Sequence, residues 1–156
     1  MTLSALRSAR LTAVPWPRCN ATELAALFAP EVVRYLPPGF QGLDDDDVRR
    51  SFLNSLADEA EVVALRMQGE GCVGLLILSL PQDGVRHLGY LLARRVWGQG
   101  LASEMLAALQ DLLGGTGVTL AGGVMDANTA SARVLEKAGF VAGSGDGDTV
   151  YRWTAP

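Results

Sequence analysis

Cysteine and histidine are scarce in this chain of 156 residues, which contains two cysteines and one histidine. Cys19 and Cys72 lie far apart, so they define neither a disulfide framework nor a zinc-ligand set. The single histidine, His87, excludes a metal centre built from histidines and leaves open only one built from carboxylates. We therefore expect no metal cofactor.

Positive charge and long apolar runs are lacking as well. Lys and Arg number 13 against 17 Asp and Glu, a formal net charge of −4, so no basic surplus exists to neutralise nucleic-acid phosphates. The longest apolar run, residues 72–80, is far shorter than the roughly 18 residues of a membrane-spanning helix. We expect neither a nucleic-acid nor a membrane partner. The chain shows no secretory hydrophobic region, which predicts a cytoplasmic location.

Apolar residues, by contrast, make up 49% of the chain, which is enough for one sizeable core. We expect a single domain over residues 1–156. Hydrophobic spacing and turn residues predict strands at 10–14, 62–67, 73–80, 85–92, 119–125, 140–142 and 149–153, the last two joined by residues 143–147. They predict helices at 23–28 (capped by Thr22), 44–56, 101–112 and 129–138, and a helical turn at 31–36. The order indicates an α/β fold of the α+β type, with a mixed sheet flanked by helices.

The most informative segment follows the third strand of the predicted meander. Gly98 and Gly100 precede an amphipathic helix, and glycines let backbone N–H groups approach a ligand closely. The first turn of a helix presents unpaired N–H groups and the positive end of the helix dipole, an arrangement typical of phosphate sites. An ordinary strand-to-helix turn carries the same two glycines, so this pattern alone leaves both interpretations open.

Two classes of phosphate site compete for this segment. A dinucleotide fingerprint would place Ser103 at its third glycine position and Asp126 as its acid, at a somewhat long spacing. Such a fingerprint normally opens a parallel sheet, but here only about a third of the chain follows it. A P-loop is excluded because no Gly-Lys-Ser or Gly-Lys-Thr occurs. A dinucleotide-binding oxidoreductase stays as the less favoured alternative.

The segment Trp97-Gly98-Gln99-Gly100-Leu101-Ala102 resembles the acyl-CoA pyrophosphate motif of the GNAT superfamily of N-acetyltransferases, commonly written (R/Q)-x-x-G-x-(G/A). Trp97 replaces the usual Arg or Gln, which is typical of the ribosomal-protein N-terminal acetyltransferase-like branch and its W-G-Q-G-x-A-x-E motif. Four further segments resemble that branch: Arg10-Leu11, residues 31–36 (E-V-V-R-Y-L), Leu88-Gly89-Tyr90 and residues 128–140 (N-T-A-S-A-R-V-L-E-K-A-G-F). The resemblance covers nearly the whole chain.

The resemblance implies acetyl-CoA as cosubstrate and a GNAT-like sheet that splays where acyl-CoA binds. Pantetheine would enter between the third meander strand and the next parallel strand. Its amides would pair with backbone groups near Leu91, Leu92 and Ala93. The pyrophosphate would bind the N–H groups of Gly98, Gln99, Gly100, Leu101 and Ala102. The CoA arm would contact Asn128, which can also serve as a helix cap. Trp97 would either cover the cofactor or pack against Tyr90.

The reaction that the resemblance implies is acetyl transfer to a primary amine, of a protein N-terminus or a small molecule, by direct attack. A backbone N–H near Leu92 would stabilise the developing oxyanion. The tyrosine that many members use as acid corresponds to Leu135, so Ser131 becomes the candidate donor to the CoA thiolate. His87 is the candidate base, since imidazole titrates near neutral pH. Glu31 and Glu104 stand behind it as base candidates.

The missing tyrosine keeps a second hypothesis open, a non-catalytic CoA-binding or sensing module. The acceptor would lie between the N-terminal helices and the meander, near Arg34, Tyr35 and Phe40. The sequence is compatible with either a monomer or a homodimer.

Overall fold

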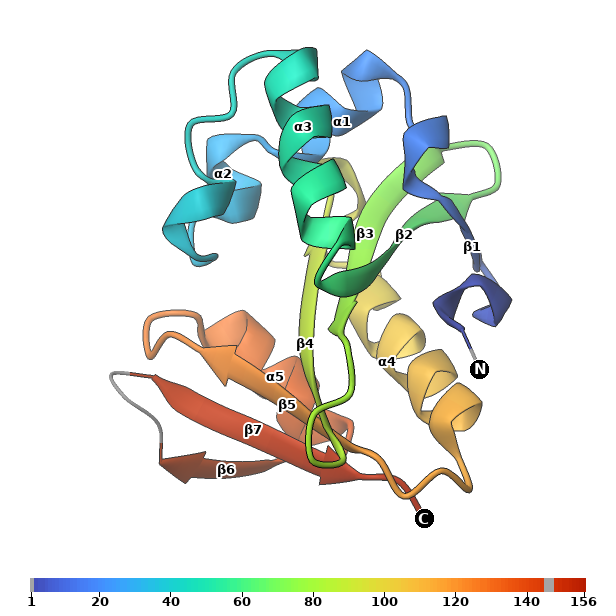
Figure 1. The fold of residues 1–156 in the computed structure, drawn as a ribbon, viewed down its shortest axis with the longest axis vertical. Helices are drawn as coiled ribbons and strands as arrows, with labels where there is room; N and C mark the ends of the chain where they lie inside the picture. The colour runs from blue at the N-terminus through green and yellow to red at the C-terminus, as the bar shows by residue number, and fades with distance from the viewer. Residues whose placement is uncertain (1, 145–147) are drawn as a thin grey trace.

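The computed structural model describes residues 2–144 and 148–156, and it contains one seven-stranded mixed sheet (Figure 1). The strand order is β1-β2-β3-β4-β5-β7-β6, and every neighbouring pair is antiparallel except β4 and β5. This confirms the predicted mixed sheet. The strands are β1 (Leu11–Pro15), β2 (Ala60–Met67), β3 (Gly71–Ser79), β4 (Val85–Leu92), β5 (Thr119–Val124), β6 (Val141–Ser144) and β7 (Thr149–Thr154).

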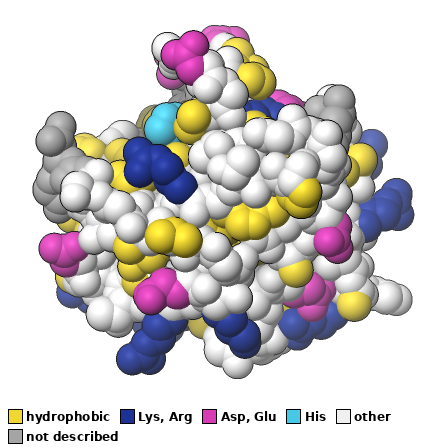
Figure 2. All heavy atoms as spheres, turned by 90° about the horizontal axis from the view of Figure 1, so that it is seen from below, with side chains coloured by type: hydrophobic (Ala, Val, Ile, Leu, Met, Phe, Trp, Pro, Cys, Tyr) yellow, Lys and Arg dark blue, Asp and Glu magenta, His cyan; other side chains and the backbone are white. Residues whose placement is uncertain are grey.

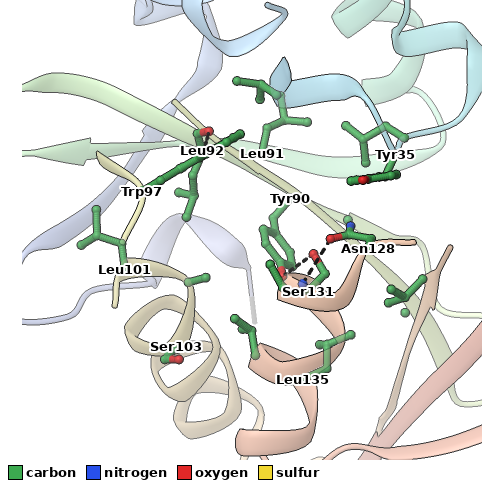
Figure 3. A pocket seen from close by; sticks show the side chains of 18 of the residues that line it. Tyr35, Tyr90, Leu91, Leu92, Trp97, Leu101, Ser103, Asn128, Ser131 and Leu135 are labelled. Atoms are coloured by element: carbon green, nitrogen blue, oxygen red, sulfur yellow. Dashed lines mark hydrogen bonds between the residues drawn. The ribbon is translucent and has the colours of Figure 1, made fainter. Parts of the chain in front are cut away.

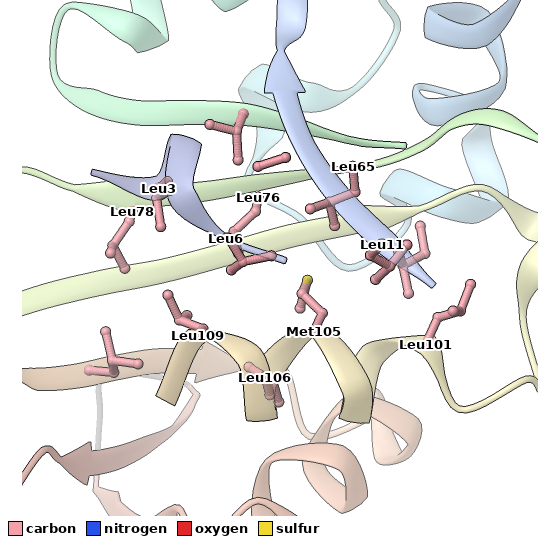
Figure 4. Close-up of a cluster of buried hydrophobic side chains, with 14 of the residues drawn as sticks. Leu3, Leu6, Leu11, Leu65, Leu76, Leu78, Leu101, Met105, Leu106 and Leu109 are labelled. Atoms are coloured by element: carbon pink, nitrogen blue, oxygen red, sulfur yellow. The ribbon is translucent and has the colours of Figure 1, made fainter. Parts of the chain in front are cut away.

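Helices cover both faces of the sheet, and each face has its own core. Helices α1 (Ala21–Leu27), α2 (Pro30–Val33) and α3 (Asp46–Ala57) pack on one face. Helices α4 (Leu101–Leu113) and α5 (Thr129–Lys137) pack on the other. Figure 4 shows leucines of the sheet and of the N-terminal segment meeting one side of α4, whose Met105, Leu106 and Leu109 are fully buried. Within the described ranges, no helix is both long and apolar enough to span a membrane.

Strand β4 contributes to both cores because successive side chains point to opposite faces. Leu91 belongs to the cluster under α1–α3, whereas Leu92 belongs to the cluster under α4 and α5. Strand β3, its neighbour, is buried along nearly its whole length. The central strands therefore hold β4 in a fixed register, with Leu78 opposite Leu88 and Gly74 opposite Leu92.

Two local predictions differ from the structure. Asn20, rather than Thr22, caps α1: its side chain accepts from the Glu23 N–H at 2.8 Å, and the Glu23 carboxylate accepts from the Asn20 N–H at 2.9 Å. This reciprocal pair is a capping box, and it starts the helix at Ala21. Gly143 and Ser144, which we expected in a turn, pair with β7 as part of β6. The rest of that turn, residues 145–147, lies outside the described residues.

The parallel pairing of β4 with β5 is short, and this determines where the site lies. Only Val85, Arg86 and His87 of β4 have partners on β5, and the last pair is His87 with Ala121. Beyond it β4 stays paired with β3, and β5 stays paired with β7. The two strands therefore diverge like the arms of a V, which is visible where β4 rises toward α1–α3 and β5 turns away (Figure 1).

An ion pair lies beside the closed end of this V. The buried Arg86 guanidinium donates to the Glu61 carboxylate at 2.8 Å and to the Ser79 carbonyl at 2.7 Å. Burial by itself raises the pKa of Glu61, but the bonds from Arg86 and from the Leu3 N–H lower that pKa below its ordinary value.

Candidate active site

A cavity of about 480 Å³ occupies the opening between the diverging strands. Its walls come from β4, the first turn of α4, the end of β5, residues 130–135 of α5, and residues 31–36 around α2. Figure 3 shows these elements converging on one space, with Leu91 and Leu92 on one side and Ser131 and Leu135 on the other.

The backbone of β4 offers unused hydrogen-bonding groups to this space. The Ala93 N–H donates to the Val73 carbonyl at 2.8 Å, so the backbone groups of residue 93 point toward β3. Because these directions alternate along a strand, the N–H and C=O groups of Tyr90 and Leu92 point toward the opening. The Leu92 carbonyl accepts from the Trp97 indole N–H at 2.8 Å. The Leu92 N–H and both backbone groups of Tyr90 face the position that a neighbouring strand would fill.

The turn between β4 and α4 supplies a second set of free donors. Gly98 and Gly100 both have φ near +76°, a conformation that costs an L-residue about 1–2 kcal/mol. Among the described residues, a Cβ on Gly98 would meet no atom within 4 Å apart from the glycine and its chain neighbours, so the space beside the turn is open. Within the described part of the chain, the backbone N–H groups of residues 98–103 donate to no protein acceptor. The turn can therefore bind an anion.

The N-terminal segment fixes this turn from behind. The Arg10 guanidinium donates to the Gln99 carbonyl at 2.9 Å and to the Glu104 carboxylate at 2.8 Å. Ser8 and the Arg10 N–H also donate to Glu104. Burial alone raises the pKa of Glu104, but these bonds lower it. The arrangement keeps the Gln99 carbonyl on the Arg10 side of the turn and neutralises the carboxylate in the first turn of α4.

The opposite wall is built by the start of α5. The Asn128 side chain caps this helix by accepting from the Ser131 N–H at 3.2 Å. The Tyr90 hydroxyl, reaching across from β4, donates to the Ser131 hydroxyl oxygen at 3.5 Å (Figure 3). Burial raises the pKa of Tyr90, which keeps its hydroxyl protonated. Two hydroxyl groups and an amide thus meet at this wall.

Most of the residues expected to bind CoA line this one cavity. They are Leu91, Leu92, Trp97, Gly98, Gly100, Leu101, Ala102, Asn128 and Ser131. Gln99 and Ala93 are outside the lining; Gln99 contributes a free N–H, whereas the Ala93 N–H is bonded to Val73. Trp97 reaches back to the Leu92 carbonyl, with the Arg94 guanidinium 5.8 Å from its ring.

His87 and two of the three residues expected near the acceptor lie outside the cavity lining. The side chain of His87 is exposed, on the surface shown in Figure 2, and it does not line the cavity, although it lies at the last paired position of the V. Of the three residues expected near the acceptor, only Tyr35 lines the cavity. Arg34 stacks on the Tyr35 ring at 5.1 Å, and Phe40 packs against Phe28 and Phe52.

Sequence reasoning missed part of the lining. Gly122 and Gly123 on β5, and Ser103 in the first turn of α4, also line the cavity. Consecutive glycines inside a strand indicate a close approach by a ligand or another backbone, and this signal was available. The contact of the Tyr90 hydroxyl with Ser131 was missed because only the fold brings the two residues together.

Open strand edges combined with unpartnered amides at a helix start suit an extended ligand with an anionic part. The family follows from the sequence match: a family model described as acetyltransferase (GNAT) domain matches residues 10–141. The chain belongs to this family. It is therefore an enzyme, an acetyltransferase that uses acetyl-CoA, and neither the oxidoreductase nor the non-catalytic module is retained.

Solved structures show the same fold. An acetyltransferase from Agrobacterium tumefaciens str. C58 is 25% identical, with a TM-score of 0.68 over 95% of this chain and 92% of that one. RimL, a ribosomal L7/L12 alpha-N-protein acetyltransferase solved with coenzyme A, is 17% identical, with a TM-score of 0.71 over 95% and 96%. MccE, a microcin C7 self-immunity acetyltransferase solved with acetyl-CoA and AMP, is 14% identical, with a TM-score of 0.74 over 94% and 93%. No curated protein matches the sequence.

Proposed function

We propose that the enzyme acetylates a primary amine, on a protein N-terminus or a small molecule, that carries no acidic group next to the amine. One observation carries this proposal: among the residues that the structure describes, the cavity lining includes the acidic Glu31 but no Lys, Arg or His. A carboxylate or phosphate beside the acceptor amine would enter the cavity without a cationic partner, which is unfavourable. Glu31 instead favours an acceptor that arrives as an ammonium ion.

The residues of the site fit acetyl-CoA. The free N–H groups of residues 98–103 suit its diphosphate, and the free backbone N–H and C=O groups of Tyr90 suit an amide of pantetheine. When bound, acetyl-CoA supplies the acetyl thioester. The Leu92 N–H is then the proposed donor to the negative charge that develops on the carbonyl oxygen.

Direct attack by the amine is supported by the positions of the cysteines. Cys19 and Cys72 are both buried in the cluster under α1–α3 and neither lines the cavity. Burial also raises the pKa of the Cys19 thiol, which disfavours the thiolate needed for a nucleophile. The cavity therefore provides no cysteine to carry an acetyl group.

For the base, we propose that His87 accepts the proton through water. It lies at the vertex of the V, and its exposed side chain has access to solvent. An α-amine has a pKa of about 7.7–8.0 and loses its proton easily near neutral pH, so a water-mediated path is adequate for a peptide N-terminus. Glu31, at the acceptor side of the cavity, is the second candidate.

Paired acceptors give the sharpest test. We expect faster release of free thiol from acetyl-CoA with an amino-acid amide than with the same amino acid, and with a peptide than with its N-blocked form. The amide and the free acid share a side chain, and because the carboxylate also raises the pKa of the neighbouring amine, kcat/KM is compared per unprotonated amine. Equal or higher kcat/KM for the free amino acid would contradict the proposed acceptor class. Failure of every amine would contradict amine acetylation itself.

A further inference from the structure

The wall of α5 lacks the expected proton donor. Leu135 occupies the position where the sequence resemblance implied a tyrosine, and its side chain is 2% exposed and has no exchangeable proton. The C–S bond of the thioester breaks more readily when the departing sulfur receives a proton. A proton donor to the departing sulfur at this wall therefore has to be a residue other than Leu135.

A tyrosine hydroxyl reaches the same wall from a different element. The Tyr90 side chain shares a face of β4 with Leu88 and Leu92, the face that packs toward α4 and α5. Its ring lines the cavity, and its hydroxyl lies 3.5 Å from the Ser131 hydroxyl oxygen. Figure 3 shows the Tyr90 ring directed at the first turn of α5.

The direction of this hydrogen bond determines where the serine proton points. Tyr90 donates and Ser131 accepts, so the Ser131 O–H is not used in the contact. Within the described residues, the Ser131 hydroxyl makes no other hydrogen bond. Since Ser131 lines the cavity, its proton is free to turn into that space. A bond donated to the serine oxygen also stabilises the negative charge that this oxygen acquires when it gives up its proton.

We propose that Tyr90 is a positioning residue that directs the Ser131 O–H into the cavity and makes it a better proton donor to the sulfur of CoA. The inference rests on the proposed amine acetylation. As the amine nitrogen bonds to the acetyl carbon and the C–S bond breaks, the electron pair goes to sulfur and the Ser131 proton follows. Ser131 regains a proton from Tyr90 or water, and the proton released by the amine returns to solvent. The products are the acetylated amine and CoA thiol.

The test compares Tyr90→Phe with Tyr151→Phe. Tyr151 is buried and lies on β7, outside the cavity lining, and it serves as the control for removing a phenol hydroxyl elsewhere in the protein. We expect Tyr90→Phe and Ser131→Ala each to lower kcat about 10-fold with little change in KM for acetyl-CoA. The double variant should lose no more than Ser131→Ala alone, because Tyr90 acts through Ser131. Tyr151→Phe should keep the kcat of the wild type.

A second measurement does not depend on turnover. The thiol of bound CoA is titrated through the ultraviolet absorbance of its thiolate, in wild type and both single variants. We expect the pKa of the CoA thiol to rise by about one unit in Ser131→Ala, which removes the hydrogen bond from the serine to the thiolate. It should rise by less in Tyr90→Phe, which keeps the serine but weakens this bond. Unchanged kcat and unchanged thiol pKa in Tyr90→Phe would overturn the inference. A wild type that binds CoA but acetylates no amine would overturn the proposed function instead.

Discussion

The indole N–H of Trp97 donates to the carbonyl of Leu92 at 2.8 Å, which closes the turn between β4 and α4. This bond uses one backbone group of Leu92 and leaves its N–H facing the cavity. We expect Trp97→Phe to keep the fold and to weaken acetyl-CoA binding about 5-fold, since one hydrogen bond contributes about 1 kcal/mol. Calorimetry measures the change, and Trp153→Phe on β7 is the control. Equal affinity in both variants would contradict a role for this bond.

Gly100 begins α4 with φ of +76° and lines the cavity. An alanine there is strained by about 1–2 kcal/mol and adds a methyl group at the turn, so we expect acetyl-CoA affinity to fall at least about 10-fold. Gly115, just beyond the end of the same helix, has φ of +82° and open space around it. Gly115→Ala should lower the thermal midpoint similarly and leave the affinity unchanged. Similar affinity losses in both would show that the effect is on stability alone.

The Arg10–Glu104 pair holds the turn and neutralises a carboxylate near the expected diphosphate. Removing only the arginine leaves this negative charge uncompensated, so we expect Arg10→Ala to weaken acetyl-CoA binding about 5-fold. Arg10→Ala combined with Glu104→Gln should recover much of that loss. Arg50→Ala breaks a comparable pair with Asp46 on α3 and should leave affinity unchanged. No recovery in the double variant would contradict the electrostatic explanation.

His87 at the vertex should matter most for acceptors that hold their proton tightly. We expect His87→Ala to lower kcat/KM about 10-fold for a lysine-type amine, whose pKa is about 10.4, and less for an α-amine. Glu31→Gln should raise KM for both amines without removing the difference between them. Rates are measured with one peptide offered with either amine blocked. If His87→Ala matches wild type for both amines and Glu31→Gln lowers kcat more for the lysine-type amine than for the α-amine, the base is Glu31.

The Arg86–Glu61 pair predicts how stability depends on pH. The folded pKa of Glu61 lies below its ordinary 4.5, so its contribution is fully present above that pH. It is lost as the pH falls through the folded value. We expect Glu61→Gln to lower the free energy of unfolding near neutral pH by about 2 kcal/mol and to flatten the decline in acid. Urea unfolding at several pH values tests this. Glu59→Gln, at an exposed neighbouring position, should keep the wild-type decline.

The sequence by itself determined the elements and the family. The strands of the meander and the amphipathic α4 follow from hydrophobic spacing and from glycine turns, which are local properties. Gly98 and Gly100 indicated the anion-binding turn because few other residues adopt a positive φ. Asn20 replaced Thr22 as a cap because both residues suit that position and only the reciprocal bond with Glu23 decides between them.

Only the tertiary structure decided which distant groups meet. The parting of β4 from β5 after His87 and Ala121 depends on pairing between strands more than thirty positions apart, which no local pattern encodes. No local pattern encodes the bond from Arg10 to the Gln99 carbonyl or the bond from Tyr90 to Ser131 either. The tertiary structure also removed the Ala93 N–H from the groups free to bind a ligand, since this N–H donates to the Val73 carbonyl. Hydrogen bonds are short-range and directional, so such contacts exist only once packing has fixed both partners.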